Sequence, residues 1–247
     1  MPPFLATMVI LVLWEAAISL FDVPRFILPR PSAAIALMFT DFGYFRPHIW
    51  ITLQETVFGF VLAVALSVPT AVMIVSVSWL EKAFFPLLVW SQVVPKMALA
   101  PLFLIWLGFG ISSKILMVLL LAFFPILLNA MIGLKSLEIE KRYLAQSIGA
   151  SRLQMFWRIQ LPAALPVMFA GLKVGVTLAL IGAVVGEFVG AAKGLGRLLI
   201  LANSNLDTAL LFAAVGWLSI LGVGLYLIID AMERLSIPWH VSQRPQR

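Results

Sequence analysis

Six long apolar stretches constrain this chain more than any other feature of its sequence. They cover residues 4–21, 53–80, 84–107, 113–134, 164–190 and 207–232. About 20 apolar residues in a helix cross the roughly 30 Å hydrocarbon core of a bilayer, and inside lipid each segment must satisfy its own backbone polar groups. The pattern predicts an all-α membrane protein with six transmembrane helices, and we expect the lipid bilayer to surround it.

The composition agrees with membrane insertion and excludes several kinds of site. Of the 247 residues, 62% are hydrophobic and 11% charged, where a soluble domain carries about 25% charged residues. There is no cysteine, and His48 and His240 lie at opposite ends of the chain, so we expect no metal site. Stretch 4–21 has neither a basic start nor a small-residue cleavage site, so it is interpreted as a retained span. Residues 1–247 are then one membrane domain.

The basic residues predict the orientation. An even number of spans puts both termini on the side of the loops near residues 81–82 and 135–163. That side carries nine bases: Lys82, Lys135, Lys141, Arg142, Arg152, Arg158, Arg234, Arg244 and Arg247. The other side carries six: Arg25, Arg30, Arg46, Lys114, Lys193 and Arg197. Because bases collect on the cytoplasmic side, we expect both termini to be cytoplasmic. The net charge of +6 is then explained by anionic lipid, with no need for nucleic acid.

Residues 136–162 form a polar, basic segment between the fourth and fifth apolar stretches. Ser136 can cap a first helix that carries Glu138 and Glu140 in its first turn. Gly149 suits the left-handed position that ends such a helix.

A second short helix is predicted after this glycine. Ser151 and Gln154 have the spacing of a capping box, and Pro162 pushes Leu161 out of helical geometry, so the second helix should end there. The pair could lie on lipid headgroups or dock in a groove of a partner protein. Its apolar contacts would be Leu144, Ile148, Leu153, Phe156, Trp157 and Ile159.

The same segment resembles the EAA-type coupling motif of permease subunits in bacterial ABC importers. In that motif a glycine is followed, after nine residues, by Ile-x-Leu-Pro, as Gly149 is by Ile159, Leu161 and Pro162. Further similarity in VPKMALAPLFLIWLGFG (94–110) and GEFVGAAKGLG (186–196) resembles the nitrate/sulfonate/taurine group, over about four-fifths of the chain. Tyr143 stands where the family pattern has glutamate.

The resemblance implies a type I importer-like fold, with a cytoplasmic coupling-helix pair between helices 4 and 5. It implies ATPase coupling through Ala145, Gly149, Ser151, Arg152, Phe156, Ile159, Leu161 and Pro162. It also implies a homodimer of permeases, two ATP-binding subunits and an extracytoplasmic solute-binding protein in the bacterial inner membrane. The chain contains no Gly-Lys dipeptide and so no nucleotide-binding loop. We therefore expect no catalytic residue and no cofactor in this chain, with ATP and Mg²⁺ held by the partner.

Polar residues inside the spans are candidates for a solute pathway. Lys96 lies midway along the third span between Pro95 and Pro101, with Gln92 one helical turn earlier. An ionisable group at that depth either touches a polar substrate or has a structural role, such as pairing with a carboxylate or capping free carbonyls. Asn129 either satisfies carbonyls freed by Pro125 or lines the pore.

Three further polar features lie nearer the ends of the spans. Glu187 is either an external gate or pairing residue, or a solvated interfacial carboxylate. Residues 52–56 are interpreted as the water interface of the second span, and Lys173 is expected to reach the headgroups.

The fifth span carries small residues at four-residue spacing, including Gly171, Gly175, Gly182, Gly186 and Gly190. Such spacing lets helices approach closely in lipid. The glycines therefore predict a packing seam beside a pathway, either between two copies of the chain or within one.

The leading interpretation is the permease of an ATP-driven importer for a small anion such as nitrate, a sulfonate or taurine. The alternative solute is a heterocyclic vitamin precursor, a pyrimidine or riboflavin. An ion-driven transporter would favour paired intramembrane acids or inverted repeats, which we do not see in the sequence. A membrane-embedded enzyme would need a His/Asp/Glu constellation or Gly-x-Ser-x-Gly, and neither is present.

Overall fold

The structure is a computed structural model that describes residues 3–24 and 26–238. Its helices are α1 (Pro3–Leu20), α2 (Pro31–Thr40), α3 (Phe42–Ser76), α4 (Ser78–Val93), the 3₁₀ turn η1 (Lys96–Leu99), α5 (Ala100–Leu107), α6 (Ile111–Lys135), α7 (Ile139–Ser147), α8 (Arg152–Met155), the π-helical turn η2 (Phe156–Gln160), α9 (Leu161–Gly190), α10 (Leu195–Ser204) and α11 (Thr208–Ser236). Within the described residues no strand is present, which agrees with the predicted all-α class.

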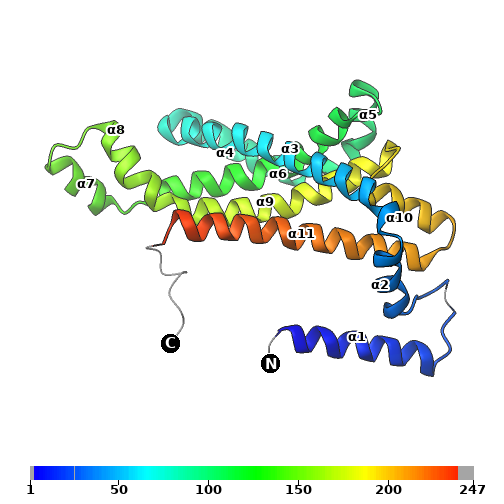
Figure 1. Cartoon of the computed structure of the whole chain (residues 1–247). Coiled ribbons are helices and arrows are strands. Elements are labelled where there is room, and N and C mark those ends of the chain that lie inside the picture. The colour runs from blue at the N-terminus through cyan, green and yellow to red at the C-terminus, as the bar shows by residue number, and fades with distance from the viewer. Residues whose placement is uncertain (1–2, 25, 239–247) are drawn as a thin grey trace.

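The long helices α3, α6, α9 and α11 lie side by side (Figure 1). Two ends can be distinguished along them. The α7–α8 end carries those two short helices, and the α10 end carries α5, α10 and the beginnings of α6 and α11. α11 finishes at the α7–α8 end, so the last described helix returns to the side of the 136–162 segment. α1 lies beside the bundle and joins it through α2.

The prediction of six spans is only partly met. Four helices are long and apolar enough to cross a membrane, and the pair α4 and η1–α5, bent by 82°, makes a fifth if it is one span. The stretch 4–21 corresponds to α1, which is among the shorter apolar helices. At 1.5 Å per residue its 18 residues extend about 27 Å, at the short end of the lengths that cross a hydrocarbon core.

The segment between the first two apolar stretches is largely helical. α3 begins at Phe42, eleven residues before the predicted span, and contains Pro47. Proline removes one helical hydrogen bond, yet Phe45 in the same turn is fully buried against α10 and α11. Tertiary burial of aromatic side chains, which outweighs the proline, explains the longer helix.

The described interior contains five apolar clusters, of which three are the largest. One fills the middle of α3, α6 and α9, and a second fills the half toward α7–α8. The third, around Phe45, Leu195 and Leu198, joins α2, α10 and α11. Many apolar side chains on the outside of α3, α4 and α5 stay exposed, as expected for surfaces that face lipid or another subunit.

Candidate functional site

The first short helix of the 136–162 segment begins later than predicted. α7 starts at Ile139 with Glu138 before it, and Ser136 instead ends α6, where its hydroxyl donates to the Gly133 carbonyl at 2.7 Å. Ser136 is therefore not the N-cap of this helix. α6 continues to Lys135, so its free C-terminal carbonyls are the nearest acceptors for the serine hydroxyl.

The end of α7 is as predicted. Gly149 has φ +78°, the Ala150 N–H donates to the Ala145 carbonyl, and the Gly149 N–H donates to the Gln146 carbonyl, each at 3.0 Å. These two bonds define the Schellman motif, which satisfies the last carbonyls of a helix. The capping box that follows is present too. The Gln154 N–H donates to Ser151 Oγ at 3.2 Å, and the Ser151 N–H donates to Gln154 Oε1 at 2.9 Å.

The second helix does not end at Leu161. It runs from Arg152 through η2 into α9, giving one helix of 39 residues that reaches Gly190. Pro162 lies in the first turn of α9 and has no N–H to donate to the preceding turn. That preceding turn is the wider π-helical turn η2, which accommodates the missing hydrogen bond. The Gln160 side chain also donates to the Leu134 carbonyl at 2.8 Å, which ties this turn to α6.

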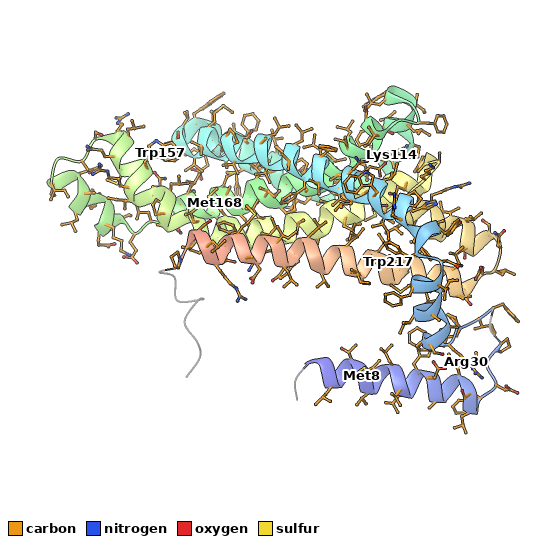
Figure 2. The ribbon with its side chains drawn as sticks, viewed as in Figure 1. Met8, Arg30, Lys114, Trp157, Met168 and Trp217 are labelled. Atoms are coloured by element: carbon orange, nitrogen blue, oxygen red, sulfur yellow. The ribbon has the colours of Figure 1, made fainter. Side chains whose placement is uncertain are left out.

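The α7–α8 pair has an inner and an outer apolar face. Ala145 and Met155 are buried against Leu137, while Phe156 and Ile159 are partly buried. On the outside lies an exposed group that we call the apolar ridge: Tyr143, Leu144, Ile148, Leu153 and Trp157. Figure 2 labels Trp157 at this end of the molecule. A groove of about 750 Å³ separates the pair from the end of α3, and exposed Arg152 lines it.

Lys96 lies where the third predicted span breaks. The chain bends between α4 and α5, and Lys96 begins the turn η1 at this bend. Its Nζ lies 4.9 Å from the centre of the Phe124 ring, a cation–π geometry. Within the described residues no carboxylate lies within ion-pair distance of it. Gln92 is exposed on α4.

Asn129 and the five glycines lie at the contact between α6 and α9. Asn129 Nδ2 donates to the Pro125 carbonyl at 2.8 Å. That carbonyl belongs to the proline itself and is not the one that its missing donor frees. A Cβ added at Gly171 would lie 2.4 Å from the Asn129 Cβ.

Gly175, Gly182 and Gly186 continue the same contact along α6, and Gly190 faces Phe109 in the link before it. A Cβ would clash with Ile126 from Gly175, with Val118 from Gly182, and with Phe109 from Gly190, and it would press on Lys114 from Gly186. The sequence left open whether the glycine seam lies between two copies of the chain or within one. In the structure these glycines pack against other parts of the same chain.

Glu187 is not a solvated interfacial carboxylate. It is fully buried and accepts hydrogen bonds from Thr52 Oγ1 at 2.6 Å and from the Gly196 N–H at 2.5 Å. The Leu195 N–H donates to Thr52 Oγ1 at 2.8 Å. Glu187 and Thr52 thereby satisfy the first donors of α10, whose N-cap Gly194 has φ +136° and no side chain to do so.

His48 completes this cap. Its Nδ1 lies 3.0 Å from both the N and the O of Gly194, and because the backbone N–H can only donate, Nδ1 accepts from it. Three of the polar residues predicted to mark the water interface are buried instead: Thr52 and Thr56 are 0% exposed and Glu55 is 3% exposed, while Gln54 is half-buried. Sequence reasoning missed this cluster because its members come from helices far apart in the chain.

Lys114 joins the cluster from α6. It is 2% exposed, and its Nζ donates to the carbonyls of Phe109 at 2.9 Å and Gly190 at 3.0 Å. Gly190 ends α9, where a cation opposes the helix dipole. A small cavity of about 210 Å³ borders Glu55, Lys114 and the exposed Lys193. Figure 2 places Lys114 opposite Trp157 along the bundle.

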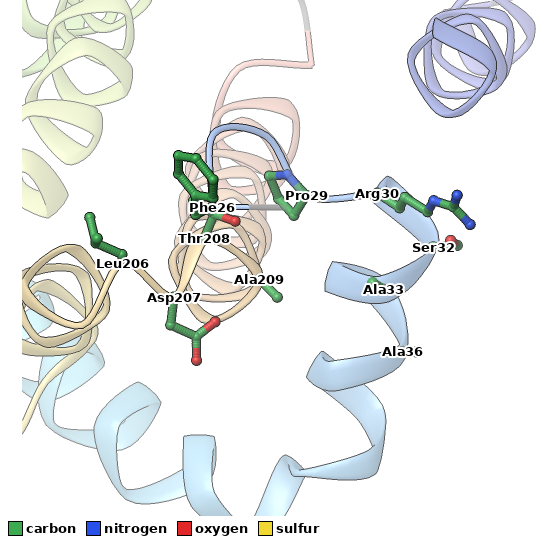
Figure 3. A pocket seen from close by; sticks show the side chains of 10 residues that line it. All are labelled: Phe26, Pro29, Arg30, Ser32, Ala33, Ala36, Leu206, Asp207, Thr208 and Ala209. Carbon is green, nitrogen blue, oxygen red and sulfur yellow. The ribbon is translucent and has the colours of Figure 1, made fainter. Parts of the chain in front are cut away.

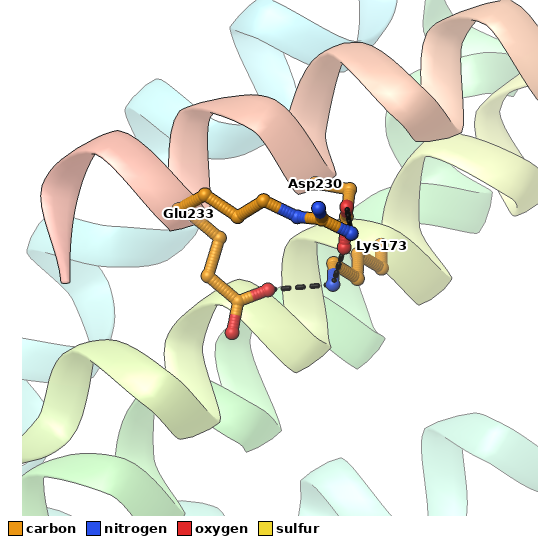
Figure 4. Close-up of polar contacts among 4 residues, drawn as sticks. Lys173, Asp230 and Glu233 are labelled. Carbon is orange, nitrogen blue, oxygen red and sulfur yellow. Dashed lines mark hydrogen bonds and ion pairs between the residues drawn. The ribbon is translucent and has the colours of Figure 1, made fainter. Parts of the chain in front are cut away.

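Lys173 pairs with two carboxylates of the same chain. Its Nζ lies 2.5 Å from both Asp230 Oδ1 and Glu233 Oε2 on α11, and Asp230 also pairs with Arg234 at 2.8 Å (Figure 4). This network fixes the last turns of α11 to α9. A cation among two carboxylates and a guanidinium gives a charge-balanced group, which lowers the cost of placing it between helices.

A larger cavity opens at the α10 end. It has about 820 Å³ and lies between the 26–36 region and the link from α10 to α11 (Figure 3). Asp207 and Arg30 both border it, with the Arg30 guanidinium directed away from Asp207. Across the described residues no group of three or more His, Cys, Asp or Glu side chains could hold a metal ion.

The long apolar helices, the broken span and the exposed two-helix element define a multi-pass membrane protein with a pair of short exposed helices at one end. Residues 57–239 match the family model "Binding-protein-dependent transport system inner membrane component". The chain belongs to this family of ABC importer permeases. It is a multi-pass inner-membrane subunit and is not itself an ATPase. Membership of a binding-protein-dependent ABC system implies that its partners are an ATPase and a binding protein.

Three relatives show how the similarity is distributed. The chain is 37% identical to the riboflavin transport system permease protein RibX of Chloroflexus aurantiacus, covering 95% of this chain and 88% of the relative. It is 35% identical to the formylaminopyrimidine transport permease protein ThiX of Halalkalibacterium halodurans, covering 98% and 96%. Identity to the taurine permease TauC of Escherichia coli is 29%, covering 94% and 87%.

The fold is similar to that of a solved importer. A chain of the inward-facing MetNI methionine ABC transporter superposes with a TM-score of 0.68 at 18% identity, covering 77% of this chain and 94% of the other. At that identity the similarity concerns the fold alone. The expected permease fold is thus confirmed, with four to five candidate spans in place of the predicted six.

Proposed function

We propose that this chain is the permease of an ATP-driven importer for a heterocyclic vitamin precursor of the riboflavin or aminopyrimidine kind. The observation that carries this choice is the order of similarity. Permeases named for riboflavin and formylaminopyrimidine are 37% and 35% identical, whereas those named for taurine and aliphatic sulfonates are 27–29% identical. This supports the alternative solute over the small anion that the sequence favoured.

The surroundings of Lys96 also weaken the argument for an anion. Its charge was the one residue-level reason to expect an anionic solute, and in the structure this charge faces the Phe124 ring. A lysine held by an aromatic face is partly compensated and attracts an anion less than a free one does. The structural role of Lys96, as a residue that stabilises the bend, therefore gains support; Gln92 and Asn129 stay candidates for the pathway.

The proposed assembly contains two copies of the permease, two ATP-binding subunits and an extracytoplasmic binding protein. In it, the α7–α8 end faces the cytoplasm together with both termini, and the apolar ridge enters a groove of the ATPase. The unbroken helix from Arg152 to Gly190 supports this proposal, since a displacement at α8 would carry along the whole of α9. Rigid-body rocking of this kind alternates access in other switching proteins.

The solute is tested with the reconstituted importer. The permease, its ATPase and its binding protein are placed in proteoliposomes, and ATP hydrolysis is measured with the binding protein loaded with riboflavin, an aminopyrimidine or taurine. We expect stimulation and uptake with one of the two heterocycles and none with taurine. Stimulation by taurine alone would contradict the proposed solute class.

Coupling is tested on the ridge. Leu144→Asp is compared with Lys141→Gln, an exposed polar position on the same helix. We expect the aspartate to abolish co-purification of the ATPase, because a charge would be buried without a partner in the groove, while the control retains it. Normal co-purification of the Leu144→Asp complex would show that the ridge does not dock there.

A further inference from the structure

The broken span is barely covered by its own chain. We call α4, η1 and α5 the bent arm, and they lie on the side of the bundle opposite α11 (Figure 1). In α4 and η1, both fully described, Leu88 is the one buried residue. Lipid can cover apolar side chains, so exposure alone does not require a partner. The bent arm differs from a lipid-facing helix in its backbone and in one polar side chain.

The backbone at the bend has polar groups without partners. The first bond of η1 runs from the Ala98 N–H to the Pro95 carbonyl at 2.9 Å, so the N–H groups of Lys96 and Met97 precede it. Within the described residues neither of these two N–H groups has an acceptor, and Met97 is 52% exposed. Non-helical backbone inside a membrane needs cover from protein or contact with water, because lipid tails offer no hydrogen bonds. The bend is therefore not a surface for lipid.

The polar side chain is Gln92, on an exposed face of α4 that leads to the bend. Phe85, Val89, Gln92 and Val93 follow one another at offsets of four, seven and eight residues, which places them on one face of the helix. We call them the α4 stripe, and all four are exposed, Val93 by 82%. An amide halfway along a span is costly in lipid, whereas between two helices it can form hydrogen bonds across the contact.

A second copy of this chain suits such a contact. A two-fold interface places each residue near its axis opposite the same residue of the other copy. A glutamine amide offers both donors and an acceptor, so Gln92 can bond to the Gln92 of another copy, which a lysine or a carboxylate could not do. A soluble ATPase or binding protein, by contrast, does not reach the middle of a span.

The bent arm also offers enough area for an interface. Its exposed aromatic side chains are accessible by 41–72%: Trp79, Phe84, Phe85, Trp90 and Trp106. At about 150–250 Å² per side chain they present roughly 600 Å². Each partner of a standard protein interface buries about 800 Å², and exposed aliphatic residues such as Val93 can supply the rest.

We propose that the bent arm is the contact surface for a second copy of this chain, with the α4 stripes of the two copies against each other and Gln92 near the two-fold axis. The contact covers the free N–H groups of the bend and removes Gln92 from lipid. The inference rests on the proposed assembly in taking the neighbouring membrane chain to be another permease. It does not depend on the solute or on docking of the ridge.

The first test uses single cysteines, since the natural chain has none. Gln92→Cys and Val93→Cys are compared with Leu87→Cys elsewhere on α4 and Val223→Cys in the middle of α11, where both natural residues are more than half exposed. The variants are oxidised with copper phenanthroline in proteoliposomes at a low protein-to-lipid ratio. We expect covalent dimers from the two stripe variants and monomers from the two controls. Equal cross-linking of all four, or monomers from all four, would overturn the proposal.

The second test fills the contact with a larger side chain. Val89 belongs to the stripe and Leu87 lies on the opposite face of α4, and both are about half exposed. Because overpacking disfavours a close contact, we expect Val89→Trp to weaken the dimer about five-fold or more and Leu87→Trp to leave it unchanged. Light scattering at several dilutions in detergent measures the dimer, and equal unfolding temperatures show that both variants are folded. Equal dimer affinities of the two variants would refute the α4 stripe as the contact. A normal dimer that does not transport a heterocycle would contradict only the proposed solute.

Discussion

The two ends of this molecule use polar and apolar side chains in opposite ways. At the α7–α8 end the polar residues cap short helices at the surface, and five large apolar side chains stay exposed in the ridge. At the α10 end a cluster of apolar residues around Phe45 is packed inside, and the ionisable residues Glu55, Lys114 and Glu187 are buried. The first arrangement leaves a surface free for a partner, whereas the second fixes helices of the same chain to one another. Substitutions should therefore affect folding at the α10 end and association at the α7–α8 end.

The largest effect on folding is expected for Lys114→Met. The substitution leaves the carbonyls of Phe109 and Gly190 without their charged donor. A buried acceptor that loses its donor costs about 1–3 kcal/mol, and here two are left, so we expect little folded protein in detergent. Lys193→Met is the matched control, because this lysine borders the same cavity but is exposed. Size-exclusion chromatography after heating measures how much of each variant stays folded. Equal amounts would show that the buried Lys114 does not stabilise the fold.

A smaller loss is expected for Gly182→Ala at the contact between α6 and α9. The new Cβ would lie 2.8 Å from the Val118 Cα, a backbone atom that cannot move alone. Overpacking of this kind costs about 1–3 kcal/mol. Gly224→Ala on α11 meets nothing within 4 Å and should be neutral or slightly stabilising. The unfolding temperatures of both variants are measured by thermal unfolding. If both equal that of the natural chain, the intrachain seam is contradicted.

Ser151→Ala should cost about 1 kcal/mol, the usual contribution of an N-cap side chain. The hydroxyl accepts from the Gln154 N–H at the surface, so the loss stays local to α8. Hydrogen exchange of the amides of residues 152–155 would report it, with Ser147→Ala as the control, since that hydroxyl only bonds a carbonyl within α7. Unchanged protection at residues 152–155 would show that the capping box does not hold the segment.

The smallest effect on folding is expected on the ridge itself. Leu144 is 67% exposed, so Leu144→Asp should leave the unfolding temperature unchanged even though we expect it to prevent ATPase binding. The next residue, Ala145, is 3% exposed and packs inside the pair, so Ala145→Asp should disorder the 136–162 segment. Circular dichroism and limited proteolysis distinguish the two. If Leu144→Asp also unfolded the segment, the ridge would be part of the core.

Local features of the 136–162 segment could be predicted from the sequence because they depend on neighbours in the chain. The glycine turn at Gly149 and the Ser151–Gln154 box involve residues within five positions of each other, and the structure shows both. The predicted stop at Leu161 was wrong for the opposite reason. Packing of α9 on α6 and the bond from Gln160 to Leu134 keep the chain helical through Pro162, and neither contact can be seen in a local pattern.

The sequence by itself determined that this chain is an all-α membrane protein with a capped, polar helical segment between two spans, because the length of an apolar stretch and the caps of a helix are properties of consecutive residues. Only the tertiary structure decided which polar residues inside the spans belong together. Thr52, Glu55, Lys114 and Glu187 come from three helices, and their spacing in the chain gives no sign of contact. They meet because glycines let α9 and α6 approach closely and because the free N–H groups of α10, buried in a low-dielectric interior, need acceptors from other helices.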